Sequence, residues 1–241
     1  MVKTIPIKGT IVSNDDKWIY DWFGIEAVSP KDVAKQLNEA NGEDITVEIN
    51  SGGGDVFAGN EMYYLLSQYK GNMIIDIVGF AGSAASVVAM AGKNRIIPSG
   101  MMMIHNVFGS ADGDYHVMDK TSDILKTANK AVANAYINKT GMTQDKLLKL
   151  MDEEKWMDAK EAVDLGFVDE IINDNKNTGP PVKTLYNAVF ANVLSPKVIE
   201  KIRNTIKSPN GKQNADSDFL IQKMKSQLNL LKLKGEKRYE I

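Results

Sequence analysis

The alternation of apolar and polar residues divides most of this chain into short strands and amphipathic helices. Residues 44–50 alternate polar and apolar side chains and run into three consecutive glycines, which is typical of a half-buried strand that ends in a tight turn. The other predicted strands cover residues 5–11, 18–21, 73–78, 95–98 and 101–105. The predicted helices cover residues 30–41 (capped by Ser29), 56–68, 84–91, 115–138, 143–151 and 158–165. Because strands and helices alternate, the sequence predicts a layered α/β domain.

The pattern changes after residue 172, where Asn, Lys, Gly and a Pro180-Pro181 pair indicate a linker. Residues 174–241 hold thirteen Lys/Arg and six Asp/Glu, whereas the preceding part holds sixteen and twenty-five. We therefore predict a domain over 1–172, a linker over 173–184 and a basic helical C-terminal extension over 185–241. A solvated tail explains this charge more simply than an acidic or nucleic-acid partner. Its last helix has apolar residues at heptad spacing over two heptads, which favours docking on its own domain or on a neighbouring subunit.

Composition narrows the chemistry that the chain can perform. With 43% hydrophobic and 25% charged residues, it can bury a substantial core, and no window resembles a membrane span, so we expect a cytoplasmic protein. The absence of cysteine excludes thiol catalysis, and two histidines argue against a histidine-rich metal site. The triple glycine lacks the Lys-Ser/Thr ending of a P-loop, so no cofactor is predicted.

The most informative segment is the small-residue turn from Gly82 to Val87, which holds two serines between a predicted strand and a predicted helix. Ser83 directly follows a glycine and precedes the helix, so its simplest role is that of an N-cap. Ser86 is the candidate nucleophile of the pair, with the Val87 N–H as a candidate donor to an oxyanion. This prediction requires the helix to begin close to Ser86, because an earlier start would engage that N–H in the first turn.

The partners of such a nucleophile can also be proposed from the residues. His105 ends an apolar strand, where a general base would lie, whereas His116 is at the polar start of a helix. The N–H of Gly54 could face the same oxyanion, although a tight turn alone also explains the glycines. The group that orients the histidine is Asp152, Glu153 or Glu154, unless this acidic run is merely a solvated surface.

Four ordered motifs over about residues 5–172 resemble the proteolytic subunit of the Clp protease, in the branch found as head-maturation proteases of tailed bacteriophages. They are Ile49-Asn50-Ser51-Gly52-Gly53-Gly54, Gly82-Ser83-Ala84-Ala85-Ser86, Met103-Ile104-His105, and the closing segments 156–162 and 166–169. The resemblance implies a ClpP/crotonase-like layered β/α superhelix with a long handle helix over 115–138, followed here by the helical C-terminal tail. It implies a serine endopeptidase active in the host cytoplasm or the prohead.

The resemblance assigns Ser86 as nucleophile, His105 as base, and the N–H groups of Gly54 and Val87 as the oxyanion hole. The acid position falls on Glu154, with Asp152 as the substitute. An extended peptide or protein substrate would run between two segments, whose residues are Asp55, Val56, Phe57, Phe108, Gly109 and Ser110.

The resemblance also implies homo-oligomeric rings, as heptamers or stacked rings, and capsid or scaffold proteins as possible partners. The family's N-terminal pore loop is not recognised, and the segment between Ser86 and His105 is short, which argues against docking of an ATPase unfoldase. Two other functions remain open at this point. One is an acyl-CoA hydratase or isomerase of the crotonase type, and the other is a non-catalytic capsid assembly component.

Overall fold

The computed structural model describes residues 2–172, 194, 198–200 and 202. The chain divides into two compact units, one formed by Met1–Lys17 with Ile25–Val193 and the other by Trp18–Gly24 with Leu194–Ile241. The predicted linker over 173–184 and nearly all of the predicted extension over 185–241, including its last helix, lie outside the described residues. These domain boundaries therefore stay predictions.

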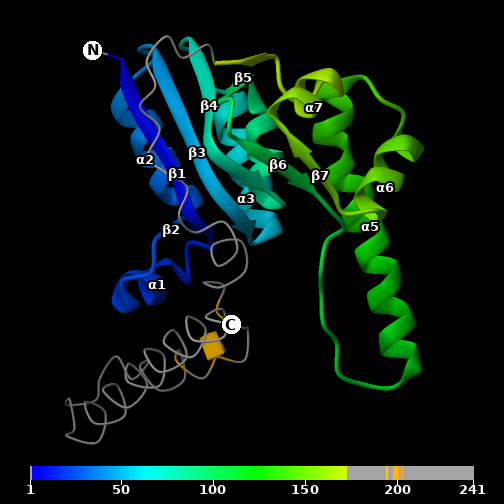
Figure 1. The fold of residues 1–241 in the computed structure, drawn as a ribbon. Helices are drawn as coiled ribbons and strands as arrows, with labels where there is room; N and C mark the ends of the chain where they lie inside the picture. Colours follow the sequence, from blue (N-terminus) through cyan, green and yellow to red (C-terminus); the bar gives the residue numbers. More distant parts are fainter. Residues whose placement is uncertain (1, 173–193, 195–197, 201, 203–241) are drawn as a thin grey trace, which may run out of the picture. The chain divides into compact units, whose positions relative to one another are not determined.

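The first unit is built on a mostly parallel sheet (Figure 1). Its main path is β2-β1-β3-β4-β5-β8, and all of these neighbours are parallel. β6 branches off as a parallel partner of β4, and β7 pairs antiparallel with β6. The strands are β1 (Lys3–Ile11), β2 (Ala27–Val28), β3 (Ile45–Gly54), β4 (Met73–Gly82), β5 (Lys93–Ile96), β6 (Met101–Ile104), β7 (Lys155–Asp158) and β8 (Glu170–Ile171).

Helices follow the strands in the order that the pattern predicts, which confirms the α/β class. α2 and α3 lie side by side behind the sheet in Figure 1, and α5 is a long handle whose first half extends beyond the sheet. The helices of this unit are α2 (Pro30–Ala40), α3 (Val56–Ser67), α4 (Ala84–Val88), a 3-10 turn (Ala89–Ala91), α5 (Tyr115–Thr140), α6 (Gln144–Asp152) and α7 (Ala159–Asp164).

The core follows from the period-two pattern of the central strands. In β3, Ile45, Val47 and Ile49 are fully buried or nearly so, whereas the residues between them are only partly buried. β1 and β4 repeat this alternation with their own buried isoleucines. Alternating apolar side chains on adjacent parallel strands thus fix the register of the sheet, because a slip of one residue would expose them all.

One prediction of secondary structure is wrong. Residues 18–21 form part of a helix, α1 (Lys17–Phe23), and not a strand. The turn that starts it is visible in the hydrogen bonds from the N–H groups of Asp16 and Lys17 to the carbonyl of Ser13. A run of four residues is too short for its periodicity to separate a strand from a helix.

The sheet forks at β4, and this fork positions the candidate site. β5 pairs with the first half of β4, at residues 74–77, and β6 pairs with the second half, with Gly82 opposite Met103. β4 is therefore longer than predicted and ends at Gly82. The residues that follow β4 and β6 come out side by side at the carboxyl edge of the sheet, where ligand sites of parallel sheets usually lie.

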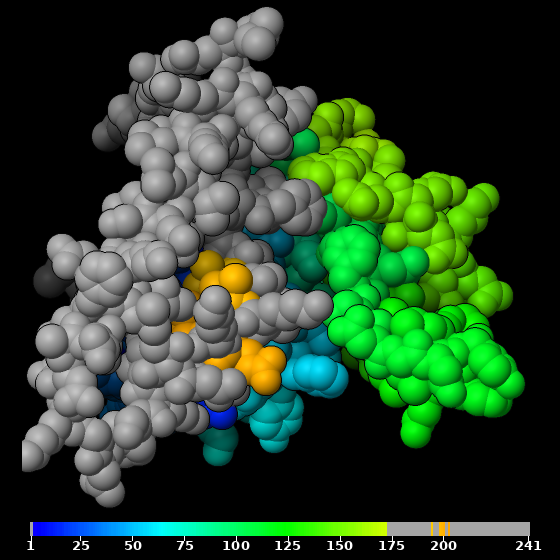
Figure 2. All heavy atoms as spheres, turned by 90° about the horizontal axis from the view of Figure 1, so that it is seen from below, coloured from blue at the N-terminus to red at the C-terminus, as the bar shows by residue number. Residues whose placement is uncertain are grey.

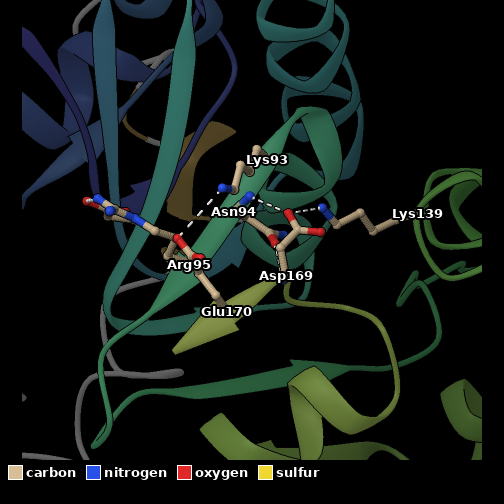
Figure 3. A network of polar contacts seen from close by, with 7 residues as sticks. Lys93, Asn94, Arg95, Lys139, Asp169 and Glu170 are labelled. Carbon is tan, nitrogen blue, oxygen red and sulfur yellow. Dashed lines mark hydrogen bonds and ion pairs between the residues drawn. The ribbon is translucent and has the colours of Figure 1, made fainter. Parts of the chain in front are cut away.

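A buried polar network ties the end of α5 to β5 and to the loop before β8 (Figure 3). The Asn94 amide nitrogen donates to the carbonyls of Ala89 and Phe167, both at 2.9 Å, and its oxygen accepts from the Asp169 N–H at 3.0 Å. The Asp169 carboxylate accepts from the Asn94 N–H at 2.7 Å and pairs with the Lys139 ammonium at 2.6 Å. Because Asn94 is fully buried, its own amide depends on these three backbone groups for its hydrogen bonds.

We expect Asn94→Ala to lower the free energy of unfolding by roughly 2–4 kcal/mol, because it removes the buried amide that donates to the Ala89 and Phe167 carbonyls. Urea unfolding followed by circular dichroism measures the change. The control is Asn72→Ala, which removes one exposed amide that donates to Asp44 and should change stability by less than about 0.5 kcal/mol. Equal effects of the two substitutions would contradict a structural role for the network.

Candidate active site

Ser83 occupies a strained turn directly after β4. Its φ and ψ are 52° and −125°, a region that non-glycine residues rarely adopt, and its N–H donates to the Met103 carbonyl at 2.9 Å. Such a conformation costs about 1–3 kcal/mol and persists only where the surroundings enforce it. The turn ends the strand abruptly and leaves the Ser83 side chain partly exposed at the sheet edge. This is the geometry of a strand-turn-helix nucleophile elbow.

His105, directly after β6, lies beside this serine. The distance from His105 Nε2 to Ser83 Oγ is 2.7 Å, which is a short hydrogen bond. The two residues meet because Gly82 and Met103 are paired across β4 and β6, so the chain continues from both strands at the same level. The imidazole is buried on its other side, and its Nε2 faces the hydroxyl. In this arrangement the histidine can act as a base and take the proton of the serine hydroxyl.

The structure does not bring Ser86 to His105, so the contact that the prediction requires is not formed. Ser86 is fully buried, and its Oγ donates to the Ser83 carbonyl at 2.6 Å and lies 2.8 Å from the Tyr136 hydroxyl. Ser83, for which we predicted a capping role, makes no side-chain cap bond and contacts His105 instead. The residue immediately after the strand, and not the one three positions later, is the serine that the histidine can reach.

The predicted oxyanion donor Val87 is wrong for the same reason. α4 begins at Ala84, so the N–H of Val87 donates to the Ser83 carbonyl at 3.3 Å within the first turn. Ala84 N–H is the group that sequence reasoning missed. As the first N–H of a helix it has no intrahelical acceptor, and it belongs to the residue that follows Ser83.

The triple-glycine turn packs directly against this elbow. A Cβ added to Gly53 would lie 2.7 Å from the Gly82 carbonyl oxygen, 2.8 Å from the Ala84 nitrogen and 2.8 Å from the Ser83 Cβ. The next glycine, Gly54, has a φ of +146°, and a Cβ there would overlap the Ile11 carbonyl oxygen at 2.1 Å. The Ser51 hydroxyl holds the turn by accepting from the Gly53 N–H at 3.0 Å. Glycine is thus required because the backbone comes so close to the serine.

The environment of His105 favours the neutral form of its imidazole. Burial lowers the pKa of His105 below its ordinary value, and the charge of Glu154 acts in the opposite direction. A neutral imidazole with its proton on Nδ1 leaves Nε2 free to accept the proton of Ser83. Within the described part of the chain, the buried Nδ1 has no hydrogen-bond partner.

The three acidic candidates lie where α6 ends and β7 begins. β7 pairs with β6 as far as Lys155 opposite Ile104, and Glu154 and His105 are the residues that adjoin this last pair. Glu154 has a left-handed φ of 50°, and its carboxylate accepts from the Trp156 indole at 3.3 Å. The Asp152 carboxylate instead accepts from the Asn106 amide at 2.7 Å, and Glu153 is the exposed C-cap of α6. Of the three, Glu154 is the one whose charge acts on His105.

The predicted substrate segments follow the glycine turn and His105 along the chain. Asp55 caps α3 by accepting from the Ala58 N–H at 2.7 Å, and Val56 and Phe57 form its first turn. Phe108, in the irregular segment after His105, packs edge-on against the imidazole with ring centroids 4.6 Å apart. Gly109 and Ser110 continue this segment without regular structure. Phe57 and Phe108 are 77% and 74% exposed, so both rings are accessible to a ligand.

Two features of the described residues bear on other functions. Among their His, Asp and Glu side chains, no group of three is arranged to hold a metal ion. None of their helices combines the length and the apolar character that crossing a membrane requires. The second histidine, His116, stacks on Tyr115 at the start of α5.

The chain is similar to known proteins in both sequence and structure. Residues 26–175 match the model of the Clp protease family. An ATP-dependent Clp protease proteolytic subunit from Bacteroides fragilis is 31% identical over 54% of this chain and 65% of its own length. The corresponding subunit from Streptococcus mutans is 30% identical over 56% of this chain and 72% of its own.

A solved structure of a ClpP1 mutant from Listeria monocytogenes superimposes with a TM-score of 0.60 at 23% identity, covering 72% of this chain and 92% of that one. The predicted ClpP-like fold is therefore confirmed. The chain spans somewhat less than two thirds of the length of the Bacteroides relatives.

Proposed function

The chain belongs to the Clp protease family, and from this premise we propose that it is a serine endopeptidase in which Ser83 is the nucleophile and His105 the general base. The observation that carries the proposal is the 2.7 Å bond between Ser83 Oγ and His105 Nε2 at a strained turn after β4. A serine hydroxyl is a weak nucleophile until an adjacent base takes its proton, and this pair supplies that base.

The proposed reaction proceeds through an acyl-enzyme. His105 Nε2 takes the Ser83 proton as Oγ bonds to the scissile carbonyl carbon, and the resulting imidazolium donates that proton to the leaving amine as the C–N bond breaks. Water then attacks the ester, with His105 again acting as base, and the carboxylic acid leaves as Oγ recovers its proton.

We assign the oxyanion hole to the backbone N–H groups of Gly54 and Ala84. Support comes from the glycine turn, which approaches the Ala84 nitrogen so closely that no side chain fits at Gly53. Backbone donors fixed in this way stabilise the developing negative charge without reorganisation during the reaction.

We assign the third group to Glu154. Support comes from its position next to the last β6–β7 pair, as His105 is, and from its charge, which opposes the lowering of the His105 pKa by burial. In this role the carboxylate accepts from Nδ1 and stabilises the imidazolium that forms when Ser83 is deprotonated. Asp152, already paired with Asn106, is the weaker candidate.

The pH dependence of kcat/KM tests this assignment. The acid limb reports the pKa of His105 in the free enzyme, which we expect below its ordinary value of about 6.5. Glu154→Gln removes a negative charge that favours the imidazolium, so the limb should move to still lower pH, together with a loss of kcat. Asp152→Asn is the matched control and should leave the limb in place. The assignment is contradicted if Asp152→Asn shifts the acid limb and Glu154→Gln does not. It is also contradicted if Glu154→Gln moves the limb to higher pH.

We propose that the enzyme binds extended peptides between the segments that contain Phe57 and Phe108, and that it works as a homo-oligomeric ring. Ring association is supported by apolar side chains on the handle: Tyr115, Val117, Met118 and Ile124 are all exposed there. In Figure 2 the end of the handle and the loop before it form one green surface. Such exposed apolar residues on a single element typify a surface that another subunit covers.

The biological setting that we propose is prohead maturation of a tailed bacteriophage, with capsid or scaffold proteins as substrates. This rests on the resemblance of the four sequence motifs to that branch. The hydratase and the non-catalytic alternatives are not favoured, because neither needs a serine held in hydrogen-bond contact with a histidine.

Hydrolysis of fluorogenic peptides by the purified full chain tests the proposed function. We expect cleavage that stops after reaction with a serine-directed fluorophosphonate, and we expect His105→Gln to remove it. Oligomeric chain that neither cleaves any peptide of a broad panel nor reacts with the fluorophosphonate would overturn the proposal.

A further inference from the structure

The buried hydroxyls of Ser86 and Tyr136 lie directly behind the elbow, and the reaction as described does not use them. Ser86 is fully buried and Tyr136 is 1% exposed. Their oxygens are 2.8 Å apart, although Ser86 is in α4 and Tyr136 is in the handle helix α5. A buried polar pair that bridges two elements costs desolvation and must be satisfied, so its placement against the reactive serine calls for an explanation.

The direction of the hydrogen bonds can be assigned from the number of protons. The Ser83 carbonyl can only accept, so the single Ser86 proton is committed to it across 2.6 Å. The Tyr136 hydroxyl must then donate to Ser86 Oγ. The order is therefore Tyr136 O–H to Ser86 O–H to the Ser83 carbonyl, and each bond polarises the next one.

This series of hydrogen bonds ends at the carbonyl of Ser83, the residue with the strained backbone conformation. The Ser83 carbonyl also accepts from the N–H groups of Ser86 and Val87, at 2.9 and 3.3 Å. With the Ser86 hydroxyl, three donors converge on this one oxygen, while the Ser83 N–H is fixed to Met103 on the other side. Contacts on both sides of Ser83 are what a residue at φ 52° needs in order to stay in that conformation.

Tyr136 is itself held firmly. Its burial raises its pKa well above the ordinary range, so it remains a neutral donor at any working pH. Its ring packs edge-on against Phe167 at 5.7 Å between centroids. α5 buries only its second half, through Val132, Ala133, Ala135 and Tyr136, and Tyr136 is the member of this set whose hydroxyl reaches Ser86.

We propose that Tyr136 and Ser86 are positioning residues that hold Ser83 in its reactive conformation through its carbonyl group, and that they thereby link the handle helix to the catalytic turn. This inference rests on the proposed function of Ser83. Neither residue touches substrate. Each limits how far the Ser83 backbone can relax. This in turn fixes the direction in which Ser83 Oγ points toward the scissile bond.

Turnover per active site distinguishes positioning from general stability. We expect Tyr136→Phe, which keeps the ring and removes only the hydroxyl, to lower kcat per titrated site about 3- to 10-fold with KM unchanged, as the loss of one positioning hydrogen bond predicts. The second-order rate of fluorophosphonate labelling should fall by the same factor. Ser86→Ala should cause a similar or larger loss. The double variant should be no slower than Ser86→Ala, because Tyr136 acts only through Ser86.

Thr140→Val is the matched control. It removes a hydroxyl one turn further along α5, which donates to the Tyr136 carbonyl and does not reach Ser83. It should reduce stability without changing kcat per titrated site. If Tyr136→Phe and Ser86→Ala also leave kcat per site unchanged, the positioning inference fails while the proposed function stands. If Ser83→Ala retains full activity, the proposed function itself fails. If Ser86→Ala does not fold, kcat per titrated site of Tyr136→Phe alone tests the positioning inference.

Discussion

Ser83→Ala is expected to lower kcat for peptide hydrolysis by at least about 10⁴-fold, because the acyl-enzyme cannot form without this oxygen. Alanine meets the same left-handed φ as the serine that it replaces, so the backbone strain is unchanged. The free energy of unfolding should consequently stay within roughly 1 kcal/mol of the parent value. Peptide hydrolysis and thermal unfolding of the same preparation measure the two quantities.

Ser86→Ala is the natural counterpart, since the two serines are three residues apart in the same turn. Ser86 is buried with its proton committed to the Ser83 carbonyl, so its removal should cost only several-fold in kcat and some stability. If Ser86→Ala is inactive and Ser83→Ala is active, the nucleophile is Ser86, as the motif alone suggested.

Gly53→Ala is expected to lower kcat/KM by about 100-fold or more. The new methyl group would lie within 2.8 Å of three atoms of the elbow, and two of them are backbone atoms that cannot move independently of Ser83. The turn and the elbow would have to separate, and a displacement of about 1 Å in an active site can cost 10²-fold. Steady-state kinetics per folded chain gives the result.

Gly141→Ala is the control for backbone strain alone. Gly141 caps α5 at a φ of +69°, and a Cβ there has no atom within 4 Å. The substitution should cost roughly 1–2 kcal/mol of stability, with kcat/KM unchanged. If both substitutions reduce kcat/KM alike, the close approach of the glycine turn to Ser83 is not what matters.

The sequence pattern was sufficient to predict the layered fold and the long handle. Alternation in residues 44–50 and amphipathic spacing in residues 30–41 are strong local signals. The helix formed within one residue of its predicted bounds, whereas the strand begins at Ile45 but continues through the glycines to Gly54. Residues 18–21 were misassigned because four residues carry too little periodicity, and the turn at Ser13 that nucleates α1 depends on specific side-chain bonds.

The candidate site was predicted less completely, for a reason that is also physical. His105 could be located because it ends a strand, but the choice between two serines depends on where β4 stops and α4 starts. Pairing of residues 80–82 with β6 extends β4 to Gly82, and this long-range contact is not visible in the local sequence. The requirement that the helix begin near Ser86 was the correct test, and the engaged Val87 N–H shows that it is not met.

Tyr136 was not anticipated at all, since nothing in the sequence places residue 136 beside residue 86. The contact arises from the packing of α5 on α4, fifty residues apart. The position of Glu154 likewise depends on the β6–β7 register and not on a motif. Local patterns therefore identified the histidine at the strand end, whereas tertiary contacts determine which side chains lie close enough to interact with it.

The identity of the serine that reacts is the most direct test of the account. The assembled full chain is treated with a fluorophosphonate, digested, and the modified residue is located by mass spectrometry. We predict one label per chain on Ser83, with labelling lost in Ser83→Ala and in His105→Gln and retained more slowly in Ser86→Ala. A label on Ser86, or labelling of Ser83 that does not depend on His105, would contradict it.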